Sequence, residues 1–298
     1  MIIVIAGPTA VGKSRLALRL AEYFDGEIIS ADSVQIYKRL DIGSDKPSEE
    51  SRRRVSHHLV DCLDIDEAYS SARFQRDARE AIEHVEKNGR VPFLVGGTGY
   101  YIKSALHDFS FEDSSRDEDR ERELKTWNLE KLHDYLERLD PVAAEKIHPN
   151  NKKRLLHAIT RAERNRPIGE DRSGETPVYD YHMLVLYMER ERLYKRIETR
   201  VDEMFENGLL EEARRLFEEA PECEASKAIG YKELFAHFRG ECTLEEAKGL
   251  IKQKSRRYAK RQLTYFRNQF DAHWIHVDVE RFEQTVEASV ESIRDHLR

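Results

Sequence analysis

A segment near the start of the chain has the residue types of a phosphate-binding loop. It fits the pattern G-x-x-x-x-G-K-[ST] and consists of Gly7, Pro8, Thr9, Ala10, Val11, Gly12, Lys13 and Ser14. In loops of this pattern, backbone N–H groups surround phosphate oxygens, the lysine adds a positive charge, and the hydroxyl is a ligand of Mg²⁺. We therefore expect the loop to bind a phosphate compound, with Ser14 as the metal ligand. The pattern does not identify the compound.

Two other polar residues follow segments that are typical of strands. Asp32 comes directly after residues 27–31, and Thr98 follows residues 91–95 and a pair of glycines. Ligands of open α/β folds bind at the carboxyl edge of the sheet, so we expect both side chains to face the phosphate-binding loop. Asp32 is suited to bind a metal, to accept a proton or to cap the next turn. The Thr98 hydroxyl is suited to contact a phosphate or to form the N-cap of a helix.

Alternating strands and helices are expected to position these residues. The apolar run 2–6 ends at Gly7 and is typical of a buried parallel strand. Apolar residues at helical spacing predict a helix directly after the loop. Further strands are expected at 27–31 and 91–95, and a helix at 100–106. This order predicts an α/β fold with a parallel sheet flanked by helices.

The character of the chain changes in its middle. Residues 113–178 form charge-rich helical segments with breaks at Asp140-Pro141, at His148-Pro149 and between 166 and 177, which predicts an inserted all-helical domain. Strands are then expected at 182–188 and 274–277, and helices at 191–206, 209–219 and 244–270. The core domain is therefore expected to comprise residues 1–112 and 179–298.

The composition is typical of a soluble globular protein. Of the 298 residues, 39% are hydrophobic and 36% are charged, and the first apolar run is too short for a membrane span or a signal peptide. The three cysteines lie far apart, so they form neither a disulfide framework nor a zinc site. We expect a cytoplasmic monomer without a membrane partner. The net charge of −7 argues against non-specific nucleic-acid binding by the whole molecule, so any such binding requires local patches.

Two basic stretches stand out against this acidic total. Between residues 252 and 267 there is no acidic residue, and there are seven basic ones, at 252, 254, 256, 257, 260, 261 and 267. On a helix, Arg257, Lys260 and Arg261 share one face, which predicts a cationic stripe. The alternative is a solvated charged face, although such faces usually mix both signs. Residues 149–172 contain seven basic and three acidic residues. Both stretches suit a phosphate-rich polymer.

The motifs taken together resemble those of the bacterial tRNA dimethylallyltransferases, a family that prenylates the adenosine beside the anticodon. The resemblance extends over nearly the whole chain. Its segments are residues 7–14, 30–37, 40–43 with Lys46-Pro47, 57–59, 95–101, 228–233 and 255–262.

For the donor side of the reaction, the resemblance implies a P-loop NTPase-like fold whose loop holds dimethylallyl diphosphate, with Mg²⁺ on Ser14. Asp32 would be the general base, Thr98 would contact the reacting diphosphate end, and Lys13 would stabilise the leaving diphosphate. Lys227 would be a minor diphosphate-binding candidate. The products would be N6-dimethylallyladenosine at position 37 of tRNA and diphosphate.

For the tRNA side, the resemblance implies that a flipped adenosine meets residues Asp32, Ser33, Val34 and Gln35. The inserted domain would clamp the anticodon stem-loop together with Arg257, Lys260 and Arg261. Its contact residues would be Lys153, Arg154, Leu155, Leu156 and His157, where His157 stands in place of the family's usual arginine.

Three other functions are alternatives. A P-loop small-molecule kinase would not need the cationic stripe or residues 32–35. A prenyl transferase acting on free adenosine nucleotides would have no use for an inserted helical domain. A non-catalytic RNA-binding protein would not need Lys13, Ser14 and Asp32 together.

Overall fold

The computed structural model of the chain describes residues 1–111, 118–164, 167–168 and 174–297. The chain divides into two compact units, one formed by residues 1–106 and 177–298 and the other by residues 107–176. The sequence predicted an insertion with limits at 113 and 178, and the first of these limits lies outside the described residues. Among the described residues, no helix combines the length and the apolar character needed to cross a membrane.

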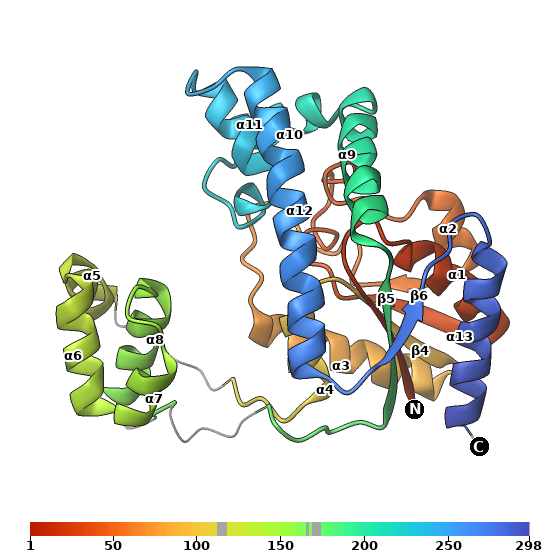
Figure 1. Cartoon of the computed structure of the whole chain (residues 1–298), viewed down its shortest axis with the longest axis horizontal. Helices are drawn as coiled ribbons and strands as arrows, with labels where there is room; N and C mark the ends of the chain where they lie inside the picture. The colour runs from red at the N-terminus through yellow and green to blue at the C-terminus, as the bar shows by residue number, and fades with distance from the viewer. Residues whose placement is uncertain (112–117, 165–166, 169–173, 298) are drawn as a thin grey trace. The chain divides into compact units, whose positions relative to one another are not determined.

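A six-stranded parallel sheet forms the centre of the larger unit, with the strand order β3-β2-β4-β1-β5-β6 (Figure 1). The strands are β1 (Ile2–Ala6), β2 (Gly26–Ser30), β3 (His57–His58), β4 (Val91–Gly96), β5 (Tyr181–Tyr187) and β6 (His273–His276). The predicted α/β fold is thus confirmed. Three strands, β2, β5 and β6, begin one residue before their predicted starts. Strand β3 was not predicted, because two residues are too few for a pattern.

Apolar side chains of the strands alternate between the two faces of the sheet. Ile2, Val4 and Ala6 pack on one face against helices α3 (Ser71–Lys87) and α4 (Gly99–Leu106). Ile3 and Ile5 pack on the other face against α1 (Lys13–Tyr23) and α13 (Phe282–His296), as Figure 1 shows. Because both faces are covered, the central strands are continuous apolar runs.

Four helices, α9 to α12, pack on one another beyond the carboxyl edge of the sheet (Figure 1). They are α9 (Arg190–Glu206), which follows β5, α10 (Leu209–Glu219), α11 (Tyr231–Phe238) and α12 (Leu244–Gln269), with the 3-10 turn η1 (Ala225–Lys227) before α11. Thr243 and Glu246 form a capping box that starts α12, and Phe266 near its end is fully buried in the core. Helix α2 (Glu49–Arg54) precedes β3.

The smaller unit is a helical bundle with its own core. Its helices are α5 (Glu118–Thr126), α6 (Leu129–Leu139), α7 (Pro141–Lys146) and α8 (Lys152–Ala162). Asp140 ends α6 and caps α7, since its side chain accepts a hydrogen bond from the Ala143 backbone N–H at 3.0 Å. The core consists of Leu124, Leu132, Leu136, Ala143, Ala144, Ile147, Leu155, Ala158 and Ile159.

Candidate functional site

The phosphate-binding loop lies between β1 and α1 and depends on two glycines. Gly7 has φ +148°, and a Cβ atom there would lie 2.8 Å from the Leu186 carbonyl oxygen, so a side chain would push the loop away from β5. Gly12 has φ +106° and forms the N-cap of α1. Only glycine adopts such angles without strain. The loop therefore ends with the first backbone N–H groups of α1, which is a geometry that binds anions.

Lys13 lies against this loop. Its amine donates a hydrogen bond to the Pro8 carbonyl oxygen at 2.7 Å. Burial lowers the pKa of Lys13 from 10.5 to about 8, and repulsion by Arg200 adds to this effect, while Asp32 and Asp45 oppose it. The positive charge is thus held in an environment that favours the arrival of an anion.

Helix α9 brings two guanidinium groups to the loop. Arg200 donates a hydrogen bond to the Thr9 hydroxyl and pairs with the Asp45 carboxylate at 3.2 Å. Its Nε atom is buried and has no hydrogen-bond partner among the described residues. Arg196 donates from Nε to the Ala10 carbonyl oxygen at 2.9 Å. A diphosphate bound to the loop would therefore meet the charge of Arg200 in addition to that of Lys13.

Arg200 was not predicted from the sequence. Its only signal was that Arg196 and Arg200 stand four residues apart and directly before the buried residues Ile197 and Val201.

Two adjoining cavities open at the carboxyl edge of the sheet. The smaller, about 100 Å³, is lined among others by Lys13, Ser14 and Asp45. The larger, about 320 Å³, has an apolar wall formed by Val34, Ile197, Val201, Met204, Ile229 and Ile251. Both cavities are lined by Thr9, Asp32, Ser44, Arg200 and Tyr258. A polar space beside the predicted phosphate-binding loop thus adjoins a partly apolar one, and Asp32 borders both.

The two carboxylate oxygens of Asp32 differ in their hydrogen bonding. Its Oδ1 accepts hydrogen bonds from the backbone N–H groups of Val34 at 2.9 Å and Gln35 at 3.3 Å, so it caps the turn after β2. The other oxygen has no hydrogen bond to any residue that the structure describes. The sequence left turn capping, metal binding and proton acceptance as alternative roles of Asp32. In the structure one oxygen caps the turn and the other is available to a ligand, so capping does not exclude the other roles.

Residues 33–35 differ in their exposure and in their contacts. Ser33 is exposed, and Val34 lines the larger cavity. The Gln35 amide accepts a hydrogen bond from Ser30 at 2.8 Å and donates to the carbonyl oxygens of Ser44 at 3.2 Å and Asp45 at 3.1 Å. The Gln35 side chain therefore braces the loop that carries Asp45.

Thr98 lies beside Tyr258 and lines neither cavity. Its carbonyl oxygen accepts the hydrogen bond that starts α4, from the Ile102 N–H at 3.2 Å. Burial and the Asp32 carboxylate raise the pKa of Tyr258, and hydrogen bonding with Thr98 is among the opposing effects.

Lys227 lines the larger cavity and is exposed, and its amine pairs with Glu224 at 2.6 Å.

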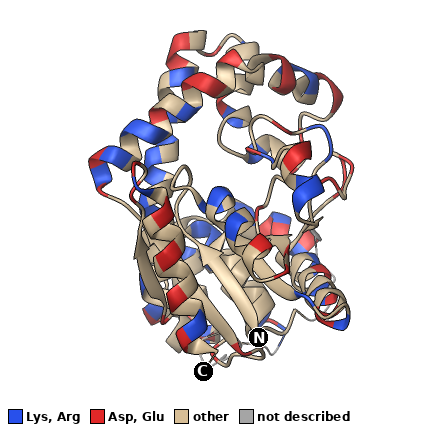
Figure 2. Cartoon of the chain, turned by 90° about the vertical axis from the view of Figure 1, so that its right-hand side faces the viewer, with Lys and Arg blue, Asp and Glu red and all other residues tan. Residues whose placement is uncertain are grey.

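The basic stretch on α12 is partly neutralised by other helices. Lys252 pairs with Asp202 at 2.7 Å, Lys254 pairs with Glu233 at 2.7 Å, and Arg256 pairs with Glu198. The local charge of the stretch is therefore reduced by acidic partners that α9 and α11 supply. Figure 2 shows cationic and anionic residues interspersed along the helices.

The predicted stripe itself is exposed. Arg257, Lys260 and Arg261 form no ion pair with any described residue, and all three are exposed to solvent. Arg261 also lines the larger cavity and lies over the Tyr258 ring, 5.6 Å from its centre. The remaining cations therefore extend from the surface to the mouth of the larger cavity.

In the smaller unit, α8 carries the other predicted tRNA contacts. Lys153, Arg154 and His157 are exposed, and Leu156 is partly buried against the core. Leu155 has an exposed fraction of 0%, so its predicted contact role is wrong for the side chain, which packs in the bundle. Helical periodicity places Leu155 on the inner face, next to Ala158 and Ile159.

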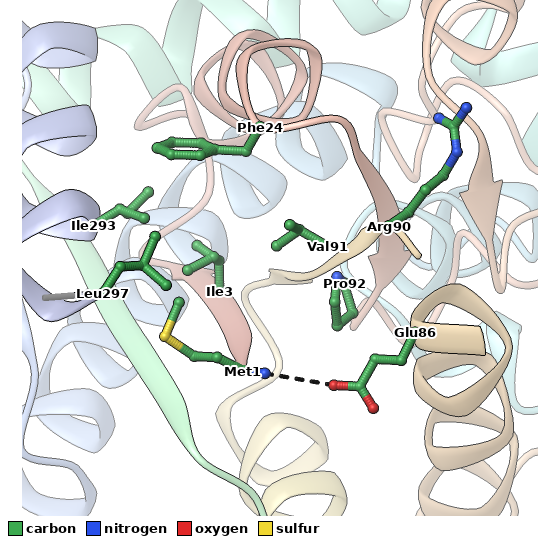
Figure 3. A pocket seen from close by; sticks show the side chains of 9 residues that line it. All are labelled: Met1, Ile3, Phe24, Glu86, Arg90, Val91, Pro92, Ile293 and Leu297. Atoms are coloured by element: carbon green, nitrogen blue, oxygen red, sulfur yellow. Dashed lines mark ion pairs between the residues drawn. The ribbon is translucent and has the colours of Figure 1, made fainter. Parts of the chain in front are cut away.

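A third cavity, of about 290 Å³, lies at the amino ends of β1 and β4, away from the loop (Figure 3). Its lining is mainly apolar, and the amino terminus of Met1 pairs with Glu86 across it at 3.5 Å. No predicted site residue lines it, so the carboxyl edge remains the candidate site.

Comparisons with known proteins show the family of the chain. A family model described as IPP transferase matches residues 35–269. A "tRNA dimethylallyltransferase" of Enterococcus faecalis is 45% identical over 282 residues, which cover 92% of this chain and 90% of the relative. The crystal structure of a tRNA delta(2)-isopentenylpyrophosphate transferase from Staphylococcus epidermidis is 38% identical, with a TM-score of 0.73, and the match covers 99% of this chain and 98% of that one.

A eukaryotic dimethylallyltransferase acting on tRNA is 29% identical, with a TM-score of 0.85 over 99% of this chain and 79% of that one. The likeness thus extends over nearly the whole length of the chain, including the phosphate-binding loop and the helices that surround it. This chain belongs to the IPP transferase family.

Proposed function

We propose that the protein transfers the dimethylallyl group of dimethylallyl diphosphate to the exocyclic amine of the adenosine beside the anticodon of tRNA, and releases diphosphate. One observation carries this proposal. Asp32 borders both the cavity that contains Lys13 and Ser14 and the larger cavity with an apolar wall. A prenyl diphosphate has a charged end and an apolar end, which match these two spaces.

The reaction forms a bond between the adenine nitrogen and the first carbon of the dimethylallyl group, and it breaks the bond from that carbon to the diphosphate oxygen. The amine is a poor nucleophile because its lone pair is delocalised into the ring. Asp32 orients the amine and accepts its proton, a contribution typically worth about 10² to 10⁴ in rate. The contact of Thr98 with the reacting diphosphate end stays a prediction, since Thr98 lines neither cavity.

Lys13, Arg200 and the loop N–H groups stabilise the charge that grows on the departing diphosphate. Such groups act most strongly when they are in place before the reaction. The donor set also fits Mg²⁺, because the Ser14 hydroxyl and the Asp45 carboxylate at the smaller cavity are hard oxygen ligands. When bound, Mg²⁺ supplies further positive charge to the diphosphate. Lys227 is a minor candidate at the larger cavity.

The tRNA contacts are proposed on two surfaces. Arg257, Lys260 and Arg261 of α12 bind backbone phosphates, and Lys153, Arg154 and His157 of the smaller unit bind others. The adenosine must leave its stack, since a stacked amine is hard to align with a leaving diphosphate. Residues 32–34 then meet the flipped base. Action as a monomer in the cytoplasm stays a prediction.

The test combines the protein with Mg²⁺, radiolabelled dimethylallyl diphosphate and an anticodon stem-loop RNA, without ATP. We expect label in the RNA, recovered as prenylated adenosine after digestion. The matched control is the same stem-loop with guanosine in place of the target adenosine, which should stay unlabelled. A reaction that requires ATP and moves its phosphate would instead support the small-molecule kinase.

A further inference from the structure

Gln262 links two loops of the site through its side-chain amide. Its Oε1 accepts a hydrogen bond from the backbone N–H of Thr9, in the phosphate-binding loop, at 3.1 Å. Its Nε2 donates to the carbonyl oxygen of Gly97, after β4, at 2.9 Å. The Gln262 side chain is buried, with an exposed fraction of 5%, although the residue belongs to α12. One side chain thus joins three segments that lie far apart in the sequence.

The fit around this amide is close. A Cβ atom at Gly97 would lie 2.2 Å from Gln262 Nε2, so the approach requires glycine at this position. Gln262 and Gly97 both line the smaller cavity, next to Lys13 and Ser14. The Thr9 amide is occupied by this contact, and the Thr9 hydroxyl is held by Arg200. The start of the loop is therefore held from two helices, α9 and α12.

We propose that Gln262 is a positioning residue that fixes the phosphate-binding loop against the loop after β4, and so sets the geometry in which diphosphate is bound. The proposal rests on the proposed function, since it concerns the same donor site. Both polar groups of its amide are engaged within the protein, so its proposed role is to position other groups. It acts through the Thr9 N–H and the Gly97 carbonyl, which keep the following loop N–H groups at the distance that a diphosphate requires.

The expected effect follows from the two hydrogen bonds. Removing the amide leaves a buried N–H and a buried C=O without partners, and the loop can then relax away from its binding geometry. Displacements of about 1 Å in a preorganised site reduce rates by about 10²-fold. We therefore expect a loss of about 10-fold in diphosphate affinity and a larger loss in prenyl transfer.

The first experiment compares Gln262→Met with Gln269→Met. Methionine keeps the length of the side chain and removes the amide. Gln269 is an exposed residue on the same helix whose amide only accepts a hydrogen bond from Lys103, so it is a matched control. Binding of inorganic pyrophosphate with Mg²⁺ is measured by calorimetry, and stem-loop RNA binding is measured separately. We expect Gln262→Met to weaken pyrophosphate binding about 10-fold while RNA affinity stays within about twofold and Gln269→Met changes neither.

The second experiment uses Gln262→Glu. A protonated glutamic acid reproduces both contacts, because its O–H donates to the Gly97 carbonyl oxygen and its C=O accepts from the Thr9 N–H. In the ionised form, a carboxylate oxygen is repelled by the Gly97 carbonyl oxygen. Burial raises the pKa of a carboxyl group at this position, so we expect the affinity relative to the natural protein to rise as the pH is lowered. Lys13, Arg200, Asp32 and Tyr258 surround the loop, so the affinity of the variant is expressed at each pH as a ratio to that of the natural protein.

Several outcomes overturn the proposal. These are pyrophosphate binding by Gln262→Met equal to that of the natural protein, parallel loss of RNA and pyrophosphate binding, and a Gln262→Glu ratio that does not change with pH. A natural protein that binds no pyrophosphate also overturns it. If the natural protein binds pyrophosphate and transfers no label to RNA, the proposed function fails, and the pyrophosphate results still decide the role of Gln262.

Discussion

Replacing Lys13 by methionine should stabilise the free protein at pH 7 while it abolishes diphosphate binding. Lys13 has its pKa lowered from 10.5 to about 8, chiefly by burial. This difference corresponds to about 3 kcal/mol of unfavourable free energy for the charged form. The lost hydrogen bond to Pro8 offsets about 1 to 2 kcal/mol. We therefore expect Lys13→Met to gain about 1 to 2 kcal/mol in unfolding free energy at pH 7.

The sign of this effect depends on pH. Below about pH 8, both the folded and the unfolded protein carry the lysine proton, so the folded state bears the full cost of the buried charge. Between about pH 8 and pH 10.5, the unfolded state still holds the proton and the folded state does not. The stability of the natural protein, relative to Lys13→Met, should therefore rise across this window, and the advantage of the variant should disappear.

Urea unfolding at about pH 7, 8.5 and 10 measures these differences. Lys87→Met is the control, because Lys87 is exposed on α3 and pairs only with Glu83; its effect should stay within about 0.5 kcal/mol at each pH. Added Mg²⁺ and pyrophosphate should stabilise the natural protein and not Lys13→Met. A Lys13→Met variant that is less stable at pH 7, or a difference that is independent of pH, would refute the reasoning.

Three further predictions concern the rest of the site. Asp32→Ala should slow single-turnover prenyl transfer by about 10² to 10⁴ while tRNA affinity stays within a few fold; normal turnover at raised Mg²⁺ would make Asp32 a metal ligand instead. Changing Arg257 and Arg261 to glutamate should weaken tRNA binding in filter assays and reduce the log-log salt slope by about 0.7 to 0.9 per lost phosphate contact, and an unchanged slope would contradict a tRNA surface. Glu212 is buried and accepts hydrogen bonds from the N–H groups of residues 41–43 at 2.6 to 2.9 Å and from Tyr231 at 2.8 Å. In urea unfolding, Glu212→Ala should therefore lose about 3 kcal/mol of unfolding free energy, and Tyr231→Phe, which removes one of these hydrogen bonds, about 1 kcal/mol. Equal losses in the two variants would argue against the contribution of the backbone contacts.

The sequence alone determined the parts of this protein that depend on short-range patterns. The phosphate-binding loop is eight consecutive residues, and the buried strands β1, β4 and β5 are continuous apolar runs. The position of Asp32 follows from the end of a strand and the direction of parallel sheets. These features need no knowledge of distant contacts, so they were predictable within one residue.

The tertiary structure decided which polar groups meet. Arg200 and Gln262 both bind Thr9, although they lie 191 and 253 residues from it in the chain. Pairing between helices likewise neutralises three cations of α12. A local pattern gives the face of a helix on which a residue lies, but the partner of that residue depends on how helices pack on the sheet. The donor site is therefore built from a loop that is visible in the sequence and from side chains that only the packing of α9 and α12 brings to it.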